Sequence, residues 1–269
     1  MKRRIYFALI ILAAIAWSGA WGWGALRRER LRTQEHEPPP PGMVLVRAGE
    51  FLMGSNDPAA DPDEMPLRKV FLPAFYIDKL EVTNRRYKEF KSSHAFATGE
   101  DDLPVTFVLK TDAEAFCRWA GRRLPTNAEW EKAARGTDGR VFPWGNEFRD
   151  GLANIHRRSG DTNGMVCKLP NASTPSKGKL PGGSFPQSVS PFGCHDMAGN
   201  VWEWVSDVWV DKSFLWSRDD GERRGILRGG ASTYSPMHAR TSHQGFEALE
   251  ATCHDVGFRC AMTATPRKR

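Results

Sequence analysis

The run from Asp196 to Trp204, near the middle of the chain, carries two carboxylates in a tryptophan-rich segment. Calcium takes about six to eight oxygen ligands from carboxylates and carbonyls, and a glycine lets the backbone turn its carbonyls toward one centre. Asp196 and Glu203 would supply side-chain oxygens, and Gly199 and Val201 would supply carbonyls. A strand whose tryptophans face a core while Glu203 faces solvent explains the same pattern. Both interpretations stay open from spacing alone.

Three histidines and an aspartate lie near one another toward the C-terminal end: His238, His243, His254 and Asp255. Two imidazoles and one carboxylate can hold iron(II) and leave positions open for oxygen. Histidines that are hydrogen-bonded or exposed are the simpler interpretation. In addition, Tyr234, Arg240 and Trp202 are candidates for lining a pocket that binds a peptide or a small molecule. The same three residues and His238 are the candidate catalytic residues.

Three short helices are expected to position these residues. The segments 111–114 and 126–129 have the spacing of a capping box, in which a threonine and a glutamate satisfy the free amides of the first turn. The two helices should end near Gly121 and Gly136, since glycine readily takes the left-handed conformation that ends a helix. A third helix should follow Thr83. The polar residues of these helices are interpreted as capping or solvent-exposed, namely Asn84, Glu129 and Glu131.

Composition restricts the class of partner. The chain has 269 residues, 40% of them hydrophobic, which suffices for one well-packed domain. The formal net charge of +6 resides at the two ends, because residues 1–37 and Arg267–Arg269 are basic and the remainder is close to neutral. No extended basic surface is expected on the domain, so nucleic acid is not a predicted partner.

The N-terminal segment 5–26 contains no charged side chain. At about 1.5 Å per residue it can cross a hydrocarbon core of about 30 Å. We predict an uncleaved membrane anchor after a basic N-terminus at 1–4, with a cleaved export signal as the alternative. Residues 27–42 form a basic and then proline-rich linker, and residues 263–269 form a basic tail.

Six collinear sequence blocks resemble one known family. They lie at residues 43–55, 75–84, 117–136, 143–146, 227–230 and 257–260. In this order they resemble the formylglycine-generating enzyme family, also called the sulfatase-modifying factor domain, over residues 43–262. The resemblance implies an α+β fold related to C-type lectins, with long ordered loops and little regular secondary structure. Together with the cysteines, it places the domain outside the cytoplasm, in the periplasm or at the cell exterior.

The resemblance also implies metal ligands and a disulfide. Asp196, Gly199, Val201 and Glu203 match one calcium site of the family, and calcium would be structural there. Asn154 and Ile155 match the start of a second site, whose later aspartate is replaced, so that site is the doubtful one. The family pairs the cysteines that correspond to Cys117 and Cys260, and the same bridge is predicted here. The pairing of Cys167, Cys194 and Cys253 stays open.

The active-site segment departs from the family pattern. Active members bind copper(I) through two cysteines that follow a Gly-Gly-Ser turn, and they oxidise a sulfatase cysteine to formylglycine. Residues 229–243 contain no cysteine here, and Tyr234 and Ala239 stand at the two positions. Copper(I) requires soft ligands such as thiolates. Copper binding and cysteine oxidation by this route are therefore not expected.

Two functions from different classes follow. The first is a membrane-anchored, extracytoplasmic relative that acts as a binding or accessory module for an unknown protein, peptide or small molecule. The alternative is an oxidoreductase or maturation enzyme that uses a remodelled active site with Tyr234, His238 and Arg240. Histidines that converge within reach of a metal would favour the enzyme.

Overall fold

The structure is a computed structural model that describes residues 24–155, 167–168, 178–210 and 223–267. Residues 24–33 are helical, and they are followed by three short α-helices: α2 (Asn84–Phe90), α3 (Lys110–Trp119) and α4 (Asn127–Arg135). Single turns of 3-10 helix lie at η1 (Pro62–Glu64), η2 (Pro186–Ser188) and η3 (Pro236–Ala239). The mixture of short helices and strands with long loops agrees with the predicted α+β class.

Short strands form four small sheets. Strand β4 (Phe75–Asp78) lies between β1 (Met43–Val46) and β11 (Ala261–Thr263), and both neighbours are antiparallel to it. A four-stranded sheet has the order β10 (Val256–Gly257), β6 (Trp202–Val210), β7 (Arg223–Arg228) and β8 (Gly245–Ala248). The two-stranded sheets pair β2 (Gly49–Met53) with β3 (Arg68–Leu72), and β5 (Cys167–Lys168) with β9 (Thr252–Cys253).

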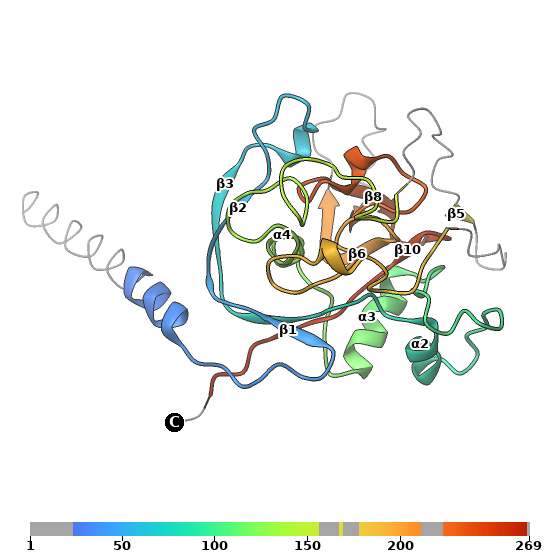
Figure 1. Ribbon diagram of the computed structural model, residues 1–269. Helices are drawn as coiled ribbons and strands as arrows, with labels where there is room; N and C mark the ends of the chain where they lie inside the picture. Colours follow the sequence, from blue (N-terminus) through green and yellow to red (C-terminus); the bar gives the residue numbers. More distant parts are fainter. Residues whose placement is uncertain (1–23, 156–166, 169–177, 211–222, 268–269) are drawn as a thin grey trace, which may run out of the picture.

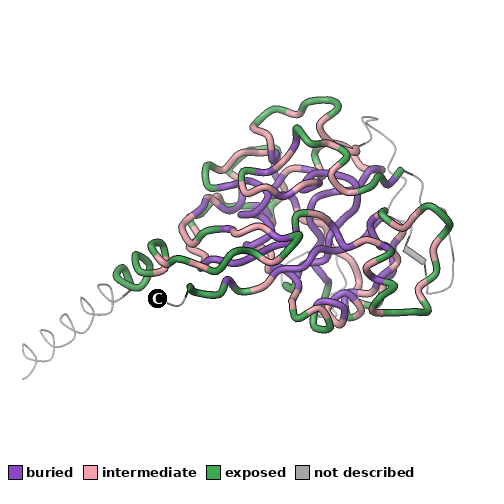
Figure 2. The backbone as a smooth tube through the Cα atoms, turned by 60° about the horizontal axis from the view of Figure 1, so that its bottom comes forward, coloured by how far each residue is buried: buried purple, intermediate pink, exposed green. Residues whose placement is uncertain are grey.

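Large aromatic side chains fill two main core clusters. One surrounds Phe116 and Phe258 beside α2 and α3, and the other surrounds Trp130 of α4. Figure 1 places α4 in the middle of the molecule and α2 with α3 at one end. Buried positions gather in the interior, and exposed positions lie on the outer loops and the N-terminal helix (Figure 2). Packing of this kind lets long loops hold a fixed shape without long hydrogen-bonded ladders.

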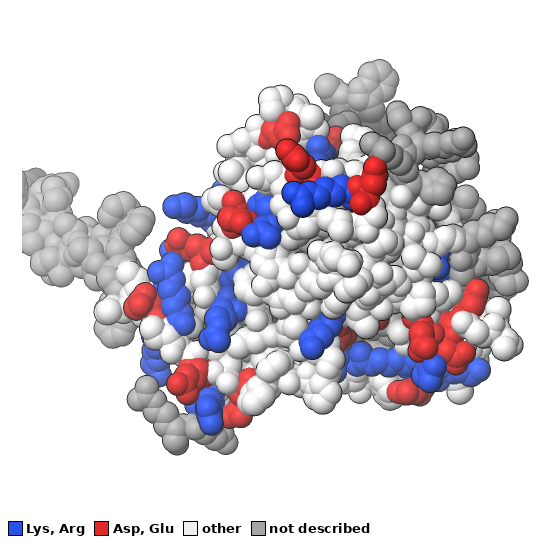
Figure 3. Space-filling view, viewed as in Figure 1, with Lys and Arg blue, Asp and Glu red and all other residues white. Residues whose placement is uncertain are grey.

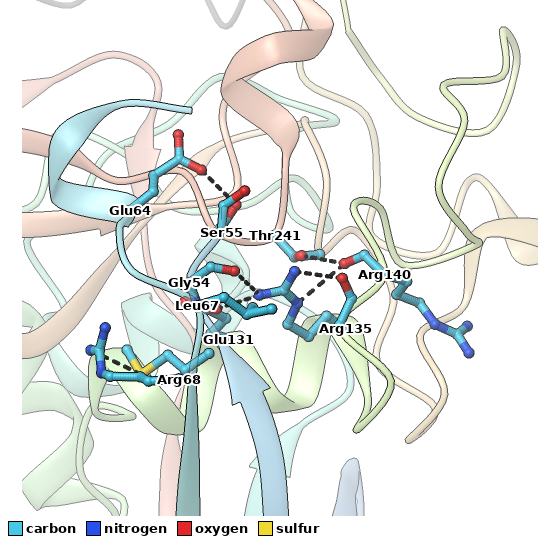
Figure 4. Close-up of polar contacts among 12 residues, drawn as sticks. Gly54, Ser55, Glu64, Leu67, Arg68, Glu131, Arg135, Arg140 and Thr241 are labelled. Atoms are coloured by element: carbon cyan, nitrogen blue, oxygen red, sulfur yellow. Dashed lines mark hydrogen bonds and ion pairs between the residues drawn. The ribbon is translucent and has the colours of Figure 1, made fainter. Parts of the chain in front are cut away.

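The centre of the fold is a buried ion-pair network on α4. Glu131 accepts hydrogen bonds from the Gly54 amide at 2.6 Å, from Arg135 Nη1 at 2.7 Å and from Arg228 Nη2 at 2.7 Å. Figure 4 shows Arg135 between Glu131 and the Gly54 carbonyl. The expectation that Glu131 caps a helix or faces solvent is wrong, because this buried side chain joins α4 to β7 and to Gly54, the residue after β2.

Helix starts agree with the sequence at two of three positions. Thr126 and Glu129 form the predicted capping box of α4, and Thr83 caps α2 by accepting from the Arg86 amide. The prediction for Thr111 is wrong, since α3 begins one residue earlier, at Lys110. Lys110 is buried and its ammonium donates to the Ser206 carbonyl at 2.9 Å. This tertiary contact fixes the first turn without a side-chain cap.

The predicted membrane anchor lies almost entirely in residues 1–23, outside the described part of the chain. Of the helices that can be described, none combines the length and apolar character needed to span a bilayer. The His36 backbone pairs with Pro266, so the two ends of the domain lie beside each other. On the face drawn in Figure 3, side chains of both charge signs are interspersed.

Candidate functional site

The run that begins at Asp196 is a tight turn packed against a neighbouring loop. Asp196, Gly199 and Asn200 all have positive φ, a left-handed conformation that favours glycine. Gly199 pairs in parallel with Asn154, and a Cβ on Gly199 would lie 2.4 Å from the Asn154 carbonyl oxygen. Only glycine fits this approach. The fold therefore brings together residues from both predicted calcium sites, Asn154 with Ile155 and the Asp196 run.

Glu203 lies at the start of β6 and is fully buried. Its Oε1 accepts from Arg259 Nη2 at 2.7 Å, and its Oε2 accepts from Arg259 Nε at 2.7 Å and from Trp130 Nε1 at 2.8 Å. The strand interpretation of this segment is thus correct, whereas the expectation of a solvated Glu203 is wrong. Both faces of β6 are covered here, since Trp202 and Trp204 are buried as well.

Glu203 belongs to a buried carboxylate cluster that also contains Glu81 and Asp196. Asp196 Oδ2 accepts from the Gly183 amide at 2.6 Å, and Glu81 Oε1 accepts from the Asn200 side chain at 2.9 Å. Glu81 Oε2 is buried and has no hydrogen-bond partner among the residues that the structure describes. Burial and the charge of Asp196 raise the pKa of Glu81, and burial likewise raises the pKa of Asp196. Three carboxylates face one guanidinium, so a divalent cation would balance the cluster.

These residues fit calcium by chemistry. Oxygen donors from carboxylates, an asparagine and nearby carbonyls are the ligands that calcium prefers, and Glu81 Oε2 makes no hydrogen bond to a described residue that would compete with a cation. Glu81 was not among the residues singled out in the sequence. It lies more than a hundred residues before Asp196, so no local spacing connects the two.

A second group of side chains lies beyond the turn at Gly229 and Gly230. The rings of Trp202, Tyr234, His238 and His243 contact one another and form the ring cluster. Tyr234 and His238 have centroids 5.1 Å apart, as have His238 and His243, and Trp202 lies 5.4 Å from Tyr234. Trp202 is only 2% exposed, so it forms the buried side of the cluster and not an open wall.

The Arg240 guanidinium does not line an open pocket beside the ring cluster, because it is bound to neighbouring groups. Its Nη1 donates to the Ala59 carbonyl at 3.0 Å, and its Nη2 donates to Glu64 Oε1 at 2.5 Å. It lines a cavity of about 100 Å³ together with Arg135, Ser242 and the loop that follows Gly54. Figure 4 shows this loop, with Glu64 above Ser55 and Arg135 below.

The four predicted iron ligands do not form one ligand set. His238 and His243 are adjacent, but His254 lies beside Phe107, with ring centroids 6.5 Å apart, and its Nδ1 is 3.8 Å from Asp255 Oδ1. In the described part of the chain, three imidazole or carboxylate donors lie within 4.8 Å of one another in the group Asp61, Glu64 and His243. The two acidic residues of that group were not predicted, because they lie far from His243 in the sequence.

Residues 28–264 match the model of the sulfatase-modifying factor enzyme 1-like domain. The chain belongs to this family. It is 28% identical to the mouse (Mus musculus) inactive C-alpha-formylglycine-generating enzyme 2, over 83% of this chain and 86% of that protein. It is 30% identical to the formylglycine-generating enzyme of Thermomonospora curvata, over 82% of this chain and 93% of that protein.

Solved structures have the same fold as this sulfatase-modifying factor domain. PvdO from Pseudomonas aeruginosa superposes with a TM-score of 0.62 at 25% identity, over 82% of this chain and 94% of that chain. CarF superposes with a TM-score of 0.59 at 20% identity, over 85% and 99% of the two chains. The predicted family and its compact mixed fold are thereby confirmed.

None of the five cysteines of this sulfatase-modifying factor domain belongs to the segment 229–243. Cys117 and Cys260 are free thiols with sulfurs 3.1 Å apart. The predicted disulfide is therefore not formed in this structure, because a disulfide bond requires about 2.05 Å between sulfurs. Cys194 is a buried free thiol, and burial raises its pKa to about 11. Cys253 is disulfide-bonded, and the Cys167 backbone lies opposite it in the β5–β9 ladder.

Proposed function

We propose that this protein is a membrane-anchored, extracytoplasmic sulfatase-modifying factor domain that works as a binding or accessory module and not as a copper-dependent oxidase. The observation that carries this proposal is the replacement of both thiolate positions by Tyr234 and Ala239. Tyr234 packs within the ring cluster and Ala239 is fully buried, so neither position offers a soft ligand. The existence of a relative named as inactive supports the same conclusion.

The free thiols of the described residues do not replace the missing pair. Cys117, Cys194 and Cys260 are fully buried, and burial raises the pKa of both Cys194 and Cys260. A buried thiol with a raised pKa is a poor nucleophile and a poor metal ligand at neutral pH. Reactive thiolate chemistry therefore has no accessible donor among them.

Copper(I) titration of the full chain in detergent, together with an oxidation assay on a peptide that carries a sulfatase cysteine, tests this proposal. We expect no stoichiometric copper(I) binding and no formylglycine. The double variant Tyr234→Cys/Ala239→Cys is the matched comparison, and it should gain copper(I) binding because two thiolates are restored at these positions. Conversion of the peptide by the unaltered protein would contradict the proposal.

A remodelled oxidoreductase site is the second candidate, and the ring cluster favours it. Tyr234 and His238 are partly exposed next to buried Trp202, an arrangement that offers a phenol and an imidazole to a ligand. Burial lowers the pKa of His238, which favours its neutral imidazole form. Oxygen consumption that depends on added substrate and disappears in His238→Ala would favour this candidate.

We further propose that calcium binds at the carboxylate cluster of Glu81, Asp196 and Glu203 and ties the surrounding loops together. The unpartnered Oε2 of Glu81 and the excess of acidic groups over Arg259 support this proposal. Carbonyls of Gly199 and Val201 are the expected backbone ligands. The role is structural, because the loops here lack extended ladders of hydrogen bonds.

Calcium is expected to stabilise the protein by about 2.7 kcal/mol when its concentration is about 100 times the Kd. Thermal unfolding of the full chain, with calcium or with a calcium chelator, measures this effect. Glu81→Gln and Asp196→Asn should abolish most of the shift, whereas the exposed control Glu89→Gln should leave it unchanged.

The calcium effect should depend on pH in a defined direction. A carboxyl with a raised pKa binds protons more tightly in the folded protein, so the stability of calcium-free protein should fall as pH rises above the ordinary carboxyl range. Calcium replaces those protons, so the gain in stability should be larger at pH 8 than at pH 5. A gain independent of pH would contradict the involvement of Glu81 and Asp196.

A further inference from the structure

Two segments far apart in the sequence meet beside the ring cluster. The first contains Asp61 and the 3-10 turn η1, which ends at Glu64, and the second contains Arg240, Ser242 and His243. Ser242 Oγ donates to Glu64 Oε2 at 2.5 Å, and the Gln244 side chain donates to the Asp63 carbonyl at 3.0 Å. These contacts hold the carboxylates of the first segment against the imidazole of the second.

His243 presents an unsatisfied nitrogen to those carboxylates. Its Nδ1 lies 3.1 Å from Asp61 Oδ2 and 3.5 Å from Glu64 Oε1, yet among the described residues this buried nitrogen makes no hydrogen bond of good geometry. The His243 side chain is only 9% exposed. A buried polar nitrogen that makes no good hydrogen bond is costly, and a cation bound between the three groups would remove that cost.

The two separations that involve His243 match those of ligands around one small ion. Donor atoms about 2.0 to 2.2 Å from a divalent metal, at tetrahedral or octahedral angles, lie roughly 3.0 to 3.5 Å from each other. The distances from His243 to the two carboxylates fall at this spacing. All three donor atoms lie within 4.8 Å of one another.

We propose that Asp61, Glu64 and His243 form a binding site for a divalent first-row transition-metal ion such as zinc. One imidazole and two carboxylates are a nitrogen and oxygen donor set of the kind that zinc, iron(II) and manganese(II) accept, and an imidazole is not a usual calcium ligand. The site is distinct from the carboxylate cluster around Glu203, and it does not depend on the function proposed above.

Arg240 regulates access to this site. Its Nη2 contacts Glu64 Oε1 and lies 3.8 Å from Asp61 Oδ2, so a guanidinium already neutralises part of the charge that would attract the metal. An incoming cation competes with Arg240 for the same oxygens. Removing the guanidinium should therefore tighten metal binding, the opposite of what a simple loss of structure would do.

Metal binding at this site would join η1 to the segment after η3. The two segments are 178 residues apart at the Ser242–Glu64 contact, so one ion would close a long loop. His243 also packs against Trp202 and His238, with ring centroids 5.9 Å and 5.1 Å apart. A metal bound to the His243 imidazole would therefore also fix the orientation of the ring cluster.

Calorimetric titration of zinc into the full chain, produced without a histidine tag, stripped with chelator and kept in calcium, tests the proposal. We expect one zinc per chain, and substitution by cobalt(II) should give the visible absorption of a nitrogen- and oxygen-bound ion. Asp61→Asn and His243→Gln should each weaken binding at least about 10-fold, because even the loss of a residue that only orients a ligand costs about that much. Arg240→Gln should strengthen it several-fold.

Two comparisons keep the result unambiguous. Asp61 has a side chain that is 46% exposed, so Asp61→Asn should fold normally and report on the metal alone. His254→Gln removes an imidazole elsewhere in the domain and should leave affinity unchanged. Absence of stoichiometric zinc, or unchanged affinity in both Asp61→Asn and His243→Gln, would overturn the proposal.

Discussion

Glu203→Gln is expected to lower the free energy of unfolding by about 3 to 5 kcal/mol, because it breaks the buried, doubly hydrogen-bonded ion pair with Arg259. Both residues are fully buried, and two parallel hydrogen bonds of 2.7 Å join them. The same carboxylate accepts from Trp130 at the centre of α4, so the change would also loosen the packing of that helix. Urea unfolding of the full chain, followed by tryptophan fluorescence, measures the loss.

Comparison variants separate a buried ion pair from a general effect of charge. Asp102→Asn breaks the exposed pair with Arg85, whose side chains are 61% and 70% exposed, and should cost less than about 1 kcal/mol. The double variant Glu203→Gln/Arg259→Gln removes both charges and should recover part of the loss. A cost for Glu203→Gln as small as that for Asp102→Asn would mean that the pair does not hold the fold together.

Oxidation of Cys117 and Cys260 to a disulfide is expected to stabilise the domain by about 4 to 5 kcal/mol. The two residues are 143 positions apart, and the entropy of a long unfolded loop is what the bond removes. The sulfurs already face each other at 3.1 Å in the core, so a small inward shift completes the bond. Denaturant unfolding under oxidising and reducing conditions, combined with alkylation of free thiols, measures the gain.

The disulfide at Cys253 also responds to reductant, so Cys117→Ser is the necessary comparison. In that variant the difference between oxidised and reduced protein should shrink to the contribution of Cys253 alone. Cys194→Ser should not reduce the difference, because Cys194 lies in a separate core cluster. Alkylation of both Cys117 and Cys260 after treatment with oxidant would show that the bond does not form.

The helices show how much of the secondary structure the local sequence determines. Thr126 and Glu129 act over three residues, and their capping box formed as predicted. Thr111 and Glu114 have the same spacing, yet the helix starts before them because Lys110 is anchored to a carbonyl of β6. A local signal therefore predicts that a helix exists, and a long-range contact can still move its first residue.

Some features of the candidate sites could likewise be predicted from the sequence. The turn around Gly199 follows from the sequence, because left-handed residues and a glycine are needed wherever the backbone turns this tightly. The absence of cysteines at Tyr234 and Ala239 was likewise visible in the sequence and directs the functional proposal. Six blocks in a fixed order were enough to predict the family that the comparisons confirm.

By itself, then, the sequence determined the family, the helices that begin at their own caps and the missing copper ligands. Only the tertiary structure decided that Glu203 pairs with Arg259, that Glu81 joins Asp196, and that Asp61 and Glu64 meet His243. Local backbone preferences extend over a few residues, whereas these partners are brought together by core packing across 56 to 182 positions. Charged side chains are buried where an oppositely charged partner lies beside them, and spacing along the chain does not reveal that partner.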